Sequence, residues 1–391
     1  MRLLFVTGEY PPLAGGIADY TYHLAHALAA SGVEVDVLTS RNVGPQPGGR
    51  VRVFATIRDW GLGILPTIRR LARGYDLVHI QYQAANFQLK GAISLVPDLL
   101  RLIGGPPTVT TFHDLRVPYL FPKAARLRLL AVRRLARASA GVITTNEEDE
   151  ATLREWRVAP LARIPLGTNI PPVLPPHFDR DAWRARWGVT PEQFLVAHFG
   201  FVNTSKGIPD LLRAQDRLLR TGQPVKVIFL GEKLGASDLT NATHLAEIEA
   251  LIEELHLDAG WTIWTGPLPS EEIAAGLHAS DVVCLPYRDG ASLRRTTLIT
   301  ALAHGRPVVS TQPTTPGRSQ ADRQPLLDDN RTLALARRAD PGDLARRLAL
   351  LLRYEPSRER LALGAAALAS HFSWERISAE HLTLYAGLLP V

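Results

Sequence analysis

Four places along the chain carry glycine, polar or charged residues that could support chemistry, and each follows a short apolar run. In the first place, Gly15 and Gly16 come shortly after the run at residues 3–7 and directly before a helical pattern. Paired glycines let backbone N–H groups approach an anion, and the N-terminus of the following helix adds positive potential. A turn that merely requires positive φ explains the same two residues, so the pair by itself is a weak indication of an anion site.

The second place is the dipeptide His113-Asp114, at the end of the apolar run 108–112. An imidazole at the carboxyl end of a strand could bond a sugar hydroxyl or shuttle a proton. The alternative is a structural histidine that only makes hydrogen bonds within the fold. The chain has twelve histidines, so a functional role for this one depends on the residues around it.

The third and fourth places lie in the second half of the chain and carry positive charge. Lys206 lies in the segment 200–207, between an apolar run and a helical pattern, where its ammonium group could meet a diphosphate. A similar turn follows the run 282–285 and opens another helix; its candidate residues are Asp289, Gly290, Ala291, Ser292, Arg294 and Arg295. Helix dipole, backbone amides and guanidinium groups would converge there on a diphosphate. An ordinary strand-to-helix turn with surface arginines has the same composition.

The elements that must position these residues alternate between strand and helix. Strands are expected at residues 3–7, 34–38, 77–82, 108–112 and 141–145, and again at 195–199, 225–230, 262–264, 282–285 and 308–311. A helix is expected at residues 18–30, with Gly32 near its C-cap. Alternation of this kind favours parallel strands joined by crossover helices.

A proline-rich stretch, residues 165–176, separates the two sets of strands. Proline fixes φ and lacks a backbone donor, so the stretch is interpreted as an interdomain linker. We therefore predict an α/β protein with two Rossmann-like, doubly wound domains facing a central cleft. Ligands of such sheets bind beyond the carboxyl ends of the strands, which places the expected site in that cleft.

Composition narrows the class of protein. A length of 391 residues exceeds what one core usually organises, and 46% hydrophobic with 21% charged residues is typical of a globular protein. Cys284 is the single cysteine, so an intramolecular disulfide and a cysteine metal cluster are excluded. No apolar run approaches the roughly 20 residues that span a bilayer, and the first run is too short for a signal peptide. We expect a cytoplasmic protein.

The net charge of +6 is unevenly distributed, because no acidic residue lies between Asp114 and Glu147. Residues 116–138 are predicted to form an amphipathic helix with a basic face. Its apolar residues at helical spacing are Leu127, Leu130, Ala131 and Leu135. The basic face could contact anionic lipid on the inner face of the membrane or an acidic acceptor, or it could be a solvated helix surface. The stretch matches no nucleic-acid reader motif, so nucleic acid is not an expected partner.

Together, in their order and spacing, these motifs resemble the GT-B glycosyltransferases, specifically the large retaining family often called family 4. The resemblance covers nearly the whole chain. It includes the glycine loop, the histidine dipeptide and the lysine segment described above. It also includes residues 301–309, which resemble the strongest C-terminal signature of the family, and residues 372–389, which resemble the terminal helix that crosses back onto the first domain.

The resemblance implies a retaining enzyme that moves a sugar from a nucleoside diphosphate sugar to a glycan, lipid-linked or small-molecule acceptor. Residues 1–170 with the terminal helix 374–391 would be the acceptor-side domain, and residues 171–373 the donor domain. His113 would contact the transferred sugar, Asp114 would support the site, and Lys206 would neutralise the departing diphosphate. Donor-binding residues would be Gly15, Gly16, Lys206, Asp289, Gly290, Ala291, Ser292, Arg294, Arg295 and Thr300. Catalysis would rest on positioning and charge stabilisation, with no metal and no cofactor.

Two departures from the family pattern stand out. Phe201 occupies the position where the family usually has an arginine, and Ser292 and Thr300 occupy the positions of its two usual glutamates. A short shift in the turn would let Asp289 replace the first glutamate, and Thr300 could still bond one ribose hydroxyl. Arg294 and Arg295 are candidates to replace the charge missing at position 201.

These departures keep two alternatives open. One is a degenerate GT-B binding protein without turnover, and the other is an enzyme that resembles a sugar-nucleotide epimerase. A separate motif, Asp179-Arg180-Asp181, matches the Asp-x-Asp metal motif of a different glycosyltransferase fold. It lies in the linker region and not at a strand end, so we interpret it as a helix cap.

Overall fold

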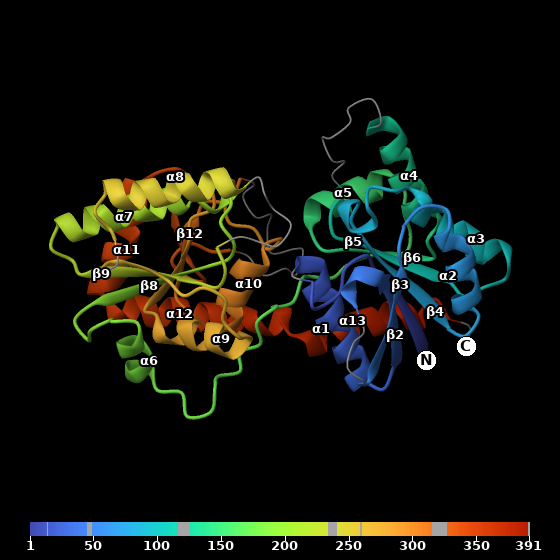
Figure 1. Cartoon of the computed structure of the whole chain (residues 1–391), viewed down its shortest axis with the longest axis horizontal. Helices are drawn as coiled ribbons and strands as arrows, with labels where there is room; N and C mark the ends of the chain where they lie inside the picture. Colours follow the sequence, from blue (N-terminus) through green and yellow to red (C-terminus); the bar gives the residue numbers. More distant parts are fainter. Residues whose placement is uncertain are drawn as a thin grey trace. The chain divides into compact units, whose positions relative to one another are not determined.

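The computed structural model of the chain describes residues 1–13, 15–44, 49–115, 125–233, 241–258, 260–314 and 327–389. The chain divides into two compact units (Figure 1). Unit 1 comprises Met1–Asn169 and Trp374–Val391, and unit 2 comprises Ile170–Ser373. The last segment of the chain therefore returns to the first unit.

Unit 1 is built on a parallel sheet with the strand order β3-β2-β1-β4-β5-β6-β7 among the described residues. The strands are β1 (Arg2–Val6), β2 (Glu34–Ser40), β3 (Val51–Ile57), β4 (Leu77–Tyr82), β5 (Thr108–Phe112), β6 (Gly141–Thr144) and β7 (Leu161–Arg163). The central strands β4 and β5 are buried along their whole length, as expected for parallel strands with helices on both faces.

Two sets of helices cover this sheet. The helices are α1 (Gly16–Ala30), α2 (Ile64–Ala72), α3 (Val96–Leu102), α4 (Ala125–Ala138), α5 (Glu147–Glu155) and α13 (Trp374–Ala386). Apolar side chains of α2, α3, α4 and α5 form one core cluster with the sheet, whereas α1 and α13 contribute to another. The indole of Trp374 donates to the carbonyl of Thr168 at 2.8 Å, which attaches the start of α13 to unit 1.

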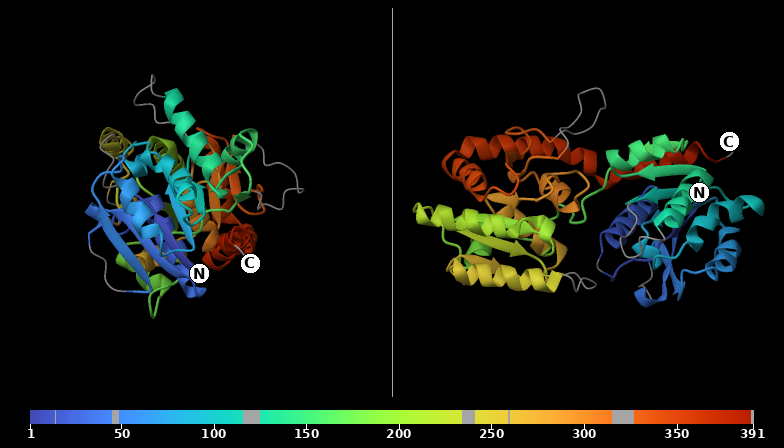
Figure 2. Two further views of the ribbon diagram at one scale, coloured as in Figure 1. Left: turned by 90° about the vertical axis from the view of Figure 1, so that its right-hand side faces the viewer. Right: turned by 90° about the horizontal axis from the view of Figure 1, so that it is seen from above.

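Unit 2 repeats the architecture with a parallel sheet in the order β10-β9-β8-β11-β12-β13 among the described residues. Its strands are β8 (Phe194–Phe199), β9 (Val225–Leu230), β10 (Thr262–Trp264), β11 (Val282–Leu285), β12 (Val308–Thr311) and β13 (Ala334–Ala336). Its helices are α6 (Arg180–Arg186), α7 (Ile208–Arg220), α8 (Asn241–Glu254), α9 (Ser270–Ala279), α10 (Thr296–Ala303), α11 (Pro341–Arg353) and α12 (Glu355–Ala369). Figure 2 shows helices on both sides of the sheet within each unit.

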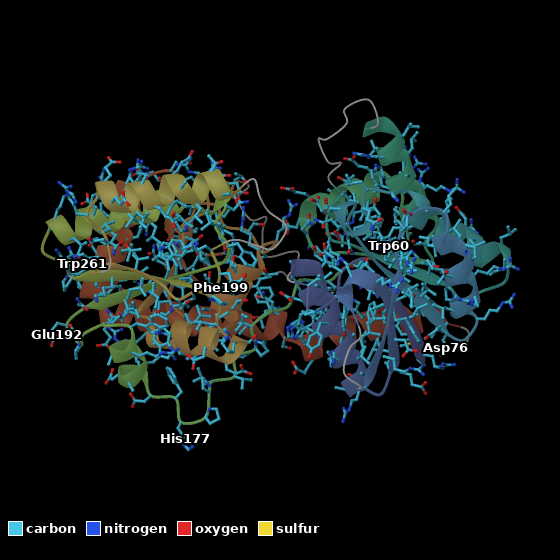
Figure 3. All side chains as sticks on the ribbon, in the orientation of Figure 1. Trp60, Asp76, His177, Glu192, Phe199 and Trp261 are labelled. Carbon is cyan, nitrogen blue, oxygen red and sulfur yellow. The ribbon has the colours of Figure 1, made fainter. Side chains whose placement is uncertain are left out.

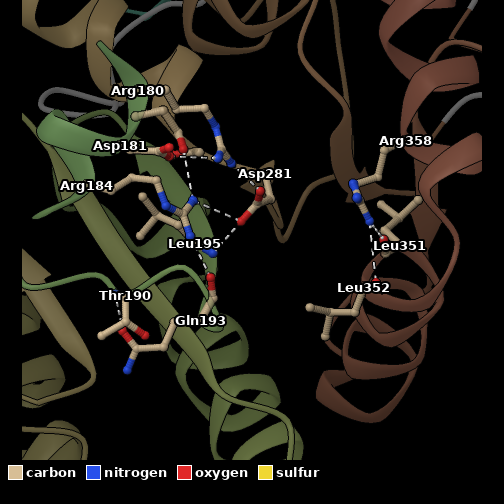
Figure 4. Close-up of polar contacts among 12 residues, drawn as sticks. Arg180, Asp181, Arg184, Thr190, Gln193, Leu195, Asp281, Leu351, Leu352 and Arg358 are labelled. Atoms are coloured by element: carbon tan, nitrogen blue, oxygen red, sulfur yellow. Dashed lines mark hydrogen bonds and ion pairs between the residues drawn. The ribbon is translucent and has the colours of Figure 1, made fainter.

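One partly buried carboxylate joins the start of unit 2 to its sheet (Figure 4). Asp281 accepts hydrogen bonds from the backbone N–H of Leu195 at 2.7 Å, from Arg180 at 2.6 Å and from Arg184 at 3.2 Å. Arg184 is almost fully buried and also donates to the carbonyl of Gln193. A buried guanidinium needs such partners, so this cluster fixes α6 against the first residues of β8.

The expected α/β architecture is confirmed. The predicted strands at 77–82, 108–112, 225–230, 262–264, 282–285 and 308–311 coincide with the observed ones, and the others agree within two residues. The helix-cap interpretation of Asp179 is also confirmed, because its carboxylate accepts from the N–H of Ala182 at the start of α6. Strands β3, β7 and β13 are not predicted from the sequence, because they lie at sheet edges and lack a long apolar run.

The prediction for the basic helix is wrong in one respect. Leu127 and Leu130 do not face the core, because they are 70% and 60% exposed, whereas Val132, Leu135 and Ala136 are buried. The first turns of α4 project away from the rest of unit 1 (Figure 1), so only its later turns reach the sheet. The predicted segment at 116–124 lies outside the described residues. Among the described residues, no helix has the length and apolar composition needed to cross a membrane.

Candidate active site

The positively charged candidates lie where the strand order of the unit 2 sheet reverses. β8 and β11 are neighbours there, although β9 and β10 separate them in sequence. In open parallel sheets, ligands bind beyond the carboxyl ends of the strands at such a point. β8 ends at Phe199, labelled in Figure 3, and leads into residues 200–207, whereas β11 leads into residues 286–295. The fold therefore brings the third and fourth places of the sequence to one edge of one sheet.

Lys206 is the central cation of this cluster. Its Nζ donates to Thr297 Oγ1 at 3.1 Å and lies 5.2 Å from the centre of the Tyr287 ring. The Tyr287 hydroxyl in turn lies 2.6 Å from Thr297 Oγ1. Burial lowers the pKa of Lys206 to about 8, and the charge of Arg295 adds to this effect. Among the described residues the ammonium has one hydrogen-bond partner, so two N–H donors remain for a phosphate group.

Arg295 shares the cluster with Lys206. Its guanidinium lies 4.3 Å from the centre of the Tyr287 ring and forms an ion pair with Asp289. It also lies 3.4 Å from Ser205 Oγ, on the loop that carries Lys206. A second cation is therefore present next to the lysine, at the residue that directly precedes α10. Asp289 is occupied by this ion pair.

Two glycines allow the loops to approach each other closely. Gly207 has a φ of +66°, and a Cβ atom there would lie 1.9 Å from the carbonyl oxygen of Pro286. Gly290 has a φ of +90°, and a Cβ atom there would lie 2.5 Å from the carbonyl oxygen of Gln312. Both positions exclude a side chain by conformation and by space. The close packing of backbones at Gly207 is what places Lys206 near Tyr287.

The structure narrows the expected role of the turn at residues 290–292. The N–H groups of Gly290 and Ala291 donate to the carbonyls of Tyr287 and Thr311. Of the three amides, the one of Ser292 has no acceptor among the described residues, so it is the amide open to a phosphate. The N-terminus of α10 adds further unpaired N–H groups and positive potential.

Arg294 precedes Arg295 in the same turn, and its N–H donates to Ser292 Oγ at 3.3 Å. The Thr300 side chain has no exposed surface, whereas Thr297, one turn earlier on α10, bonds Lys206. Thr297 and Tyr287 were not among the residues proposed from the sequence. The spacing of Thr297 could have identified it, because it precedes Thr300 by three residues and both therefore lie on one helix face. Tyr287 comes two residues before Asp289 in the same turn.

The two arginines of this turn, Arg294 and Arg295, are expected to contribute differently to nucleoside diphosphate binding. We predict that Arg295→Ala weakens binding of a nucleoside diphosphate about tenfold to a hundredfold, because a charge-assisted contact worth about 1.5–3 kcal/mol is lost. The loss also leaves the Asp289 carboxylate unpaired near the phosphates. Isothermal titration should show a much smaller effect for Arg294→Ala. The double variant Arg295→Ala/Asp289→Asn should recover part of the affinity; equal losses for the two single variants would contradict the assignment.

In unit 1 the strand order reverses between β1 and β4. β1 leads into Gly8, where a Cβ atom would lie 1.6 Å from the carbonyl oxygen of Asn86, so the loop passes directly against the segment after β4. Gly15 is the N-cap of α1, and a Cβ atom there would lie 2.9 Å from Glu9 Oε2. Gly16 is exposed and has open space at its Cβ position. Gly15 therefore borders a carboxylate, whereas Gly16 borders open space.

Two carboxylates that the sequence analysis did not propose lie at this loop. They are Glu9 and Asp19, and burial raises the pKa of both. Asp19 accepts a hydrogen bond from the Asn169 amide at 3.4 Å, which opposes the effect of burial on its pKa. Carboxylate oxygens accept hydrogen bonds from hydroxyl groups. Next to the open position at Gly16, they are suited to bind a polyhydroxylated molecule.

His113 lies at the carboxyl end of β5, next to β4 in the same sheet. Its Nε2 lies 2.8 Å from Gln81 Oε1, and its ring packs edge-on against Tyr20 with 4.8 Å between ring centres. Burial lowers the pKa of His113 to about 3, and the charge of a protonated His381 would add to this effect. The imidazole is therefore neutral at physiological pH and can both donate and accept a hydrogen bond. Asp114 follows it and is partly buried.

The fold is that of glycosyltransferases with solved structures. Sucrose-phosphate synthase from Thermosynechococcus elongatus matches with a TM-score of 0.72 and 22% identity, covering 99% of each chain. Anabaena HepE, solved in complex with UDP and glucose, matches with a TM-score of 0.73 and 19% identity, covering 99% of this chain and all of that one. Two parallel α/β units of this kind define the GT-B class of glycosyltransferases.

Sequence comparison gives the family. Residues 15–167 match the glycosyl transferase 4-like domain, and residues 193–354 match the glycosyl transferases group 1 domain. D-inositol 3-phosphate glycosyltransferase from Nocardia farcinica is 29% identical, and the match covers 96% of this chain and 85% of that enzyme. The enzyme of that name from Corynebacterium diphtheriae is 26% identical over 100% of this chain and 96% of its own. The chain belongs to the GT4-like glycosyltransferases.

Proposed function

We propose that the chain is a retaining glycosyltransferase that takes a sugar from a nucleoside diphosphate sugar and needs no metal. Unit 2 binds the donor, and unit 1 binds the acceptor. Lys206 and Arg295 neutralise the departing diphosphate, and His113 hydrogen-bonds the transferred sugar while Asp114 supports this part of the site. The protein contributes positioning and charge stabilisation to a same-face displacement.

The observation that carries this proposal is the cation cluster at the edge of the unit 2 sheet. Two cations share one tyrosine ring there, next to the N-terminus of α10 and at a reversal of strand order. Each of these features favours a phosphate group, and two positive charges match the charge of a nucleoside diphosphate leaving group. They also supply the charge that a divalent cation supplies in other phosphate sites, which supports the metal-free proposal.

A thermal-shift panel tests the donor class. UDP, GDP, ADP, CDP and dTDP are each added with magnesium or with EDTA; UDP comes first, because Anabaena HepE was solved with UDP and with UDP-glucose. A ligand at 100 times its Kd stabilises the protein by about 2.7 kcal/mol. We expect one nucleotide to raise Tm equally under both conditions. A shift that appears only with magnesium would overturn the metal-free proposal, and no shift with any nucleotide would favour a degenerate binding protein.

The acceptor and the stereochemistry are tested by product analysis. Once the nucleotide is known, the matching donor sugar is offered with inositol 3-phosphate, the acceptor in the name of the relatives, and with simple glycan and lipid-linked acceptors. NMR of the product should show the anomeric configuration of the donor. The opposite configuration would exclude a retaining reaction. Release of free sugar or isomerised donor without acceptor would favour the epimerase-like alternative.

The pKa of Lys206 predicts how donor binding depends on pH. A folded-state pKa of about 8 lies below the ordinary lysine value, so the ammonium is fully charged at lower pH and loses its proton as pH rises through about 8. We expect the affinity for the nucleoside diphosphate to be constant between about pH 6.5 and 7 and to fall by up to tenfold per pH unit well above pH 8. Titration calorimetry measures this pH dependence. In Lys206→Ala the affinity should no longer fall above pH 8. A fall that persists in this variant would show that another group titrates.

We also propose that unit 1 makes peripheral contact with anionic membrane through the segment 116–138. Leu127, Leu129 and Leu130 are exposed on α4, on the same helix as Arg134 and Arg137. A second group of leucine and arginine side chains lies on α2 and α3 of the same unit. Between α2 and α3, a pocket of about 390 Å³ is lined by Leu65, Pro66, Arg69, Arg70, Arg73 and Leu99. Exposed leucines next to arginines suit a surface that is apolar below and anionic at the head groups.

Co-sedimentation with vesicles tests this contact. The wild type is expected to pellet with vesicles rich in anionic lipid at low salt and to be released as salt screens the arginines. Leu127→Ser/Leu130→Ser should lower the partition coefficient at least about tenfold, because each inserted leucine contributes about 1.5–3 kcal/mol. Leu363→Ser, at a 73% exposed leucine of α12 in unit 2, is the matched control. No pelleting of the wild type at low salt would end the proposal.

A further inference from the structure

A chain of buried polar side chains runs through unit 1 from α13 to His113. The Tyr385 hydroxyl lies 2.6 Å from His79 Nδ1, and Thr111 Oγ1 lies 2.7 Å from His79 Nε2. Gln81 Nε2 lies 3.5 Å from the same His79 nitrogen, and Gln81 Oε1 lies 2.8 Å from His113 Nε2. The side chains of Tyr385, His79, Thr111 and Gln81 are all fully buried. Nothing in the proposed chemistry uses these four residues directly.

The direction of each hydrogen bond follows from the amide of Gln81. An amide oxygen can only accept, so His113 must carry its proton on Nε2 and donate it to Gln81. The amide NH₂ of Gln81 can only donate, so His79 Nε2 carries no proton and accepts from both Gln81 and Thr111. The single proton of His79 is then on Nδ1 and is donated to the Tyr385 oxygen. The orientation of the Gln81 amide thus determines the tautomers of both His79 and His113.

The imidazoles have one proton each because they are buried and therefore neutral. Burial lowers the pKa of His79 well below its ordinary value and that of His113 to about 3. His381, whose Nδ1–H donates to the carbonyl of Ile377, has its pKa lowered to about 4 by burial. A neutral imidazole has one N–H and one bare nitrogen, so its tautomer decides which ligand group it can bind.

We propose that Gln81, itself held by His79 and Tyr385, is a positioning residue that keeps His113 in the Nε2–H tautomer and leaves Nδ1 as an acceptor for a hydroxyl group of the transferred sugar. The proposal rests on the proposed function for the identity of that sugar. Among the described residues, His113 Nδ1 has no hydrogen-bond partner, whereas Nε2 is occupied by Gln81. The terminal helix α13 therefore acts on the site through the tyrosine that fixes His79.

The tautomer can be observed directly. The full-length protein is labelled with ¹⁵N-histidine, and two-bond ¹⁵N–¹H spectra show which ring nitrogen carries the proton, with His113→Asn to assign the signals. The wild type should show His113 as Nε2–H. Gln81→Leu keeps the side-chain volume without the hydrogen bonds, and it should give a mixture of tautomers. Tyr385→Phe removes only the acceptor for His79 and should give a smaller change. A wild-type Nδ1–H tautomer, or an unchanged tautomer in Gln81→Leu, would overturn the proposal.

Kinetic measurements on the same variants show whether Gln81 positions His113 for the transfer step or only stabilises the fold. Gln81→Leu should lower kcat for sugar transfer about tenfold or more, while affinity for the nucleoside diphosphate, which unit 2 binds, stays the same. Gln215→Leu is the matched control, because Gln215 is a fully buried glutamine of unit 2 whose hydrogen-bond partners, within the part of the chain that the structure describes, are two backbone carbonyls and a threonine. It should leave the His113 tautomer unchanged and kcat nearly so. A changed tautomer with unchanged kcat would overturn the positioning role. Failure of the proposed function would appear separately, as absence of nucleotide binding by the wild type.

Discussion

Lys206→Ala is expected to lower kcat for sugar transfer by about 10²–10³ and to weaken nucleoside diphosphate binding about tenfold to a hundredfold. The ammonium is held by Thr297 next to the Tyr287 ring, and it has two donors left for the phosphates. Its loss therefore removes charge where charge develops on the leaving group. Thermal shift with the preferred nucleotide and single-turnover transfer measure the two effects.

A second lysine gives the control for this prediction. Lys226 lies on β9 of the same sheet, is buried, and donates to the carbonyl of Gly188. Lys226→Ala removes a charge from unit 2 without touching the loops after β8 and β11. It should cost stability but leave nucleotide affinity within about twofold. Equal losses of affinity in the two variants would show that the Lys206 effect is a general one of charge or folding.

His113→Ala is expected to lower kcat at least about a hundredfold while nucleoside diphosphate affinity stays nearly unchanged. The imidazole lies in unit 1, is neutral, and has one free ring nitrogen among the described residues. We therefore expect it to act on the sugar and not on the diphosphate. Rapid-quench transfer assays, run beside titration with the nucleotide, separate the two quantities.

His278→Ala is the matched control for the histidine prediction. Burial lowers the pKa of His278 to about 4, so it is also a neutral imidazole, but it belongs to α9 in unit 2. Its replacement should leave kcat within about twofold. A parallel loss of nucleotide affinity in His113→Ala would instead indicate that the variant is misfolded or that His113 belongs to the diphosphate site.

The two large predictions divide the site by chemistry. Variants at Lys206 and Arg295 should affect leaving-group binding, whereas variants at His113 and Gln81 should affect the transfer step. In unit 2 the two cations follow the strands at which the strand order reverses, whereas in unit 1 Gln81 lies on β4 and His113 directly follows the neighbouring strand β5. The ion pair between Arg295 and Asp289 also bears on the missing family residues. Asp289 is engaged with Arg295 of its own turn, and we propose that Arg295 replaces the charge that the family usually has at position 201.

The sequence by itself determined the order of the elements and the loops that carry chemistry. Buried parallel strands appear as continuous apolar runs, which is why β4, β5, β9 and β11 were located without error. Gly207 and Gly290 identified their turns, because the backbone there needs positive φ and has no room for a side chain. Local patterns of this kind are encoded within a few residues, so they can be predicted without knowledge of the fold.

Only the tertiary structure decided which side chains meet. Thr297 and not Thr300 bonds Lys206, and Arg295 reaches Tyr287 and Ser205, because side-chain direction on a helix or turn follows from its packing against the sheet. The neighbours of His113 come from β4 and, through His79, from α13, and the contact between His79 and Tyr385 joins residues 306 positions apart. Leu127 and Leu130 have the spacing of core residues, yet α4 extends beyond the surface that would cover them. Helical periodicity gives the face of a residue, but the presence of a partner for that face depends on distant parts of the chain.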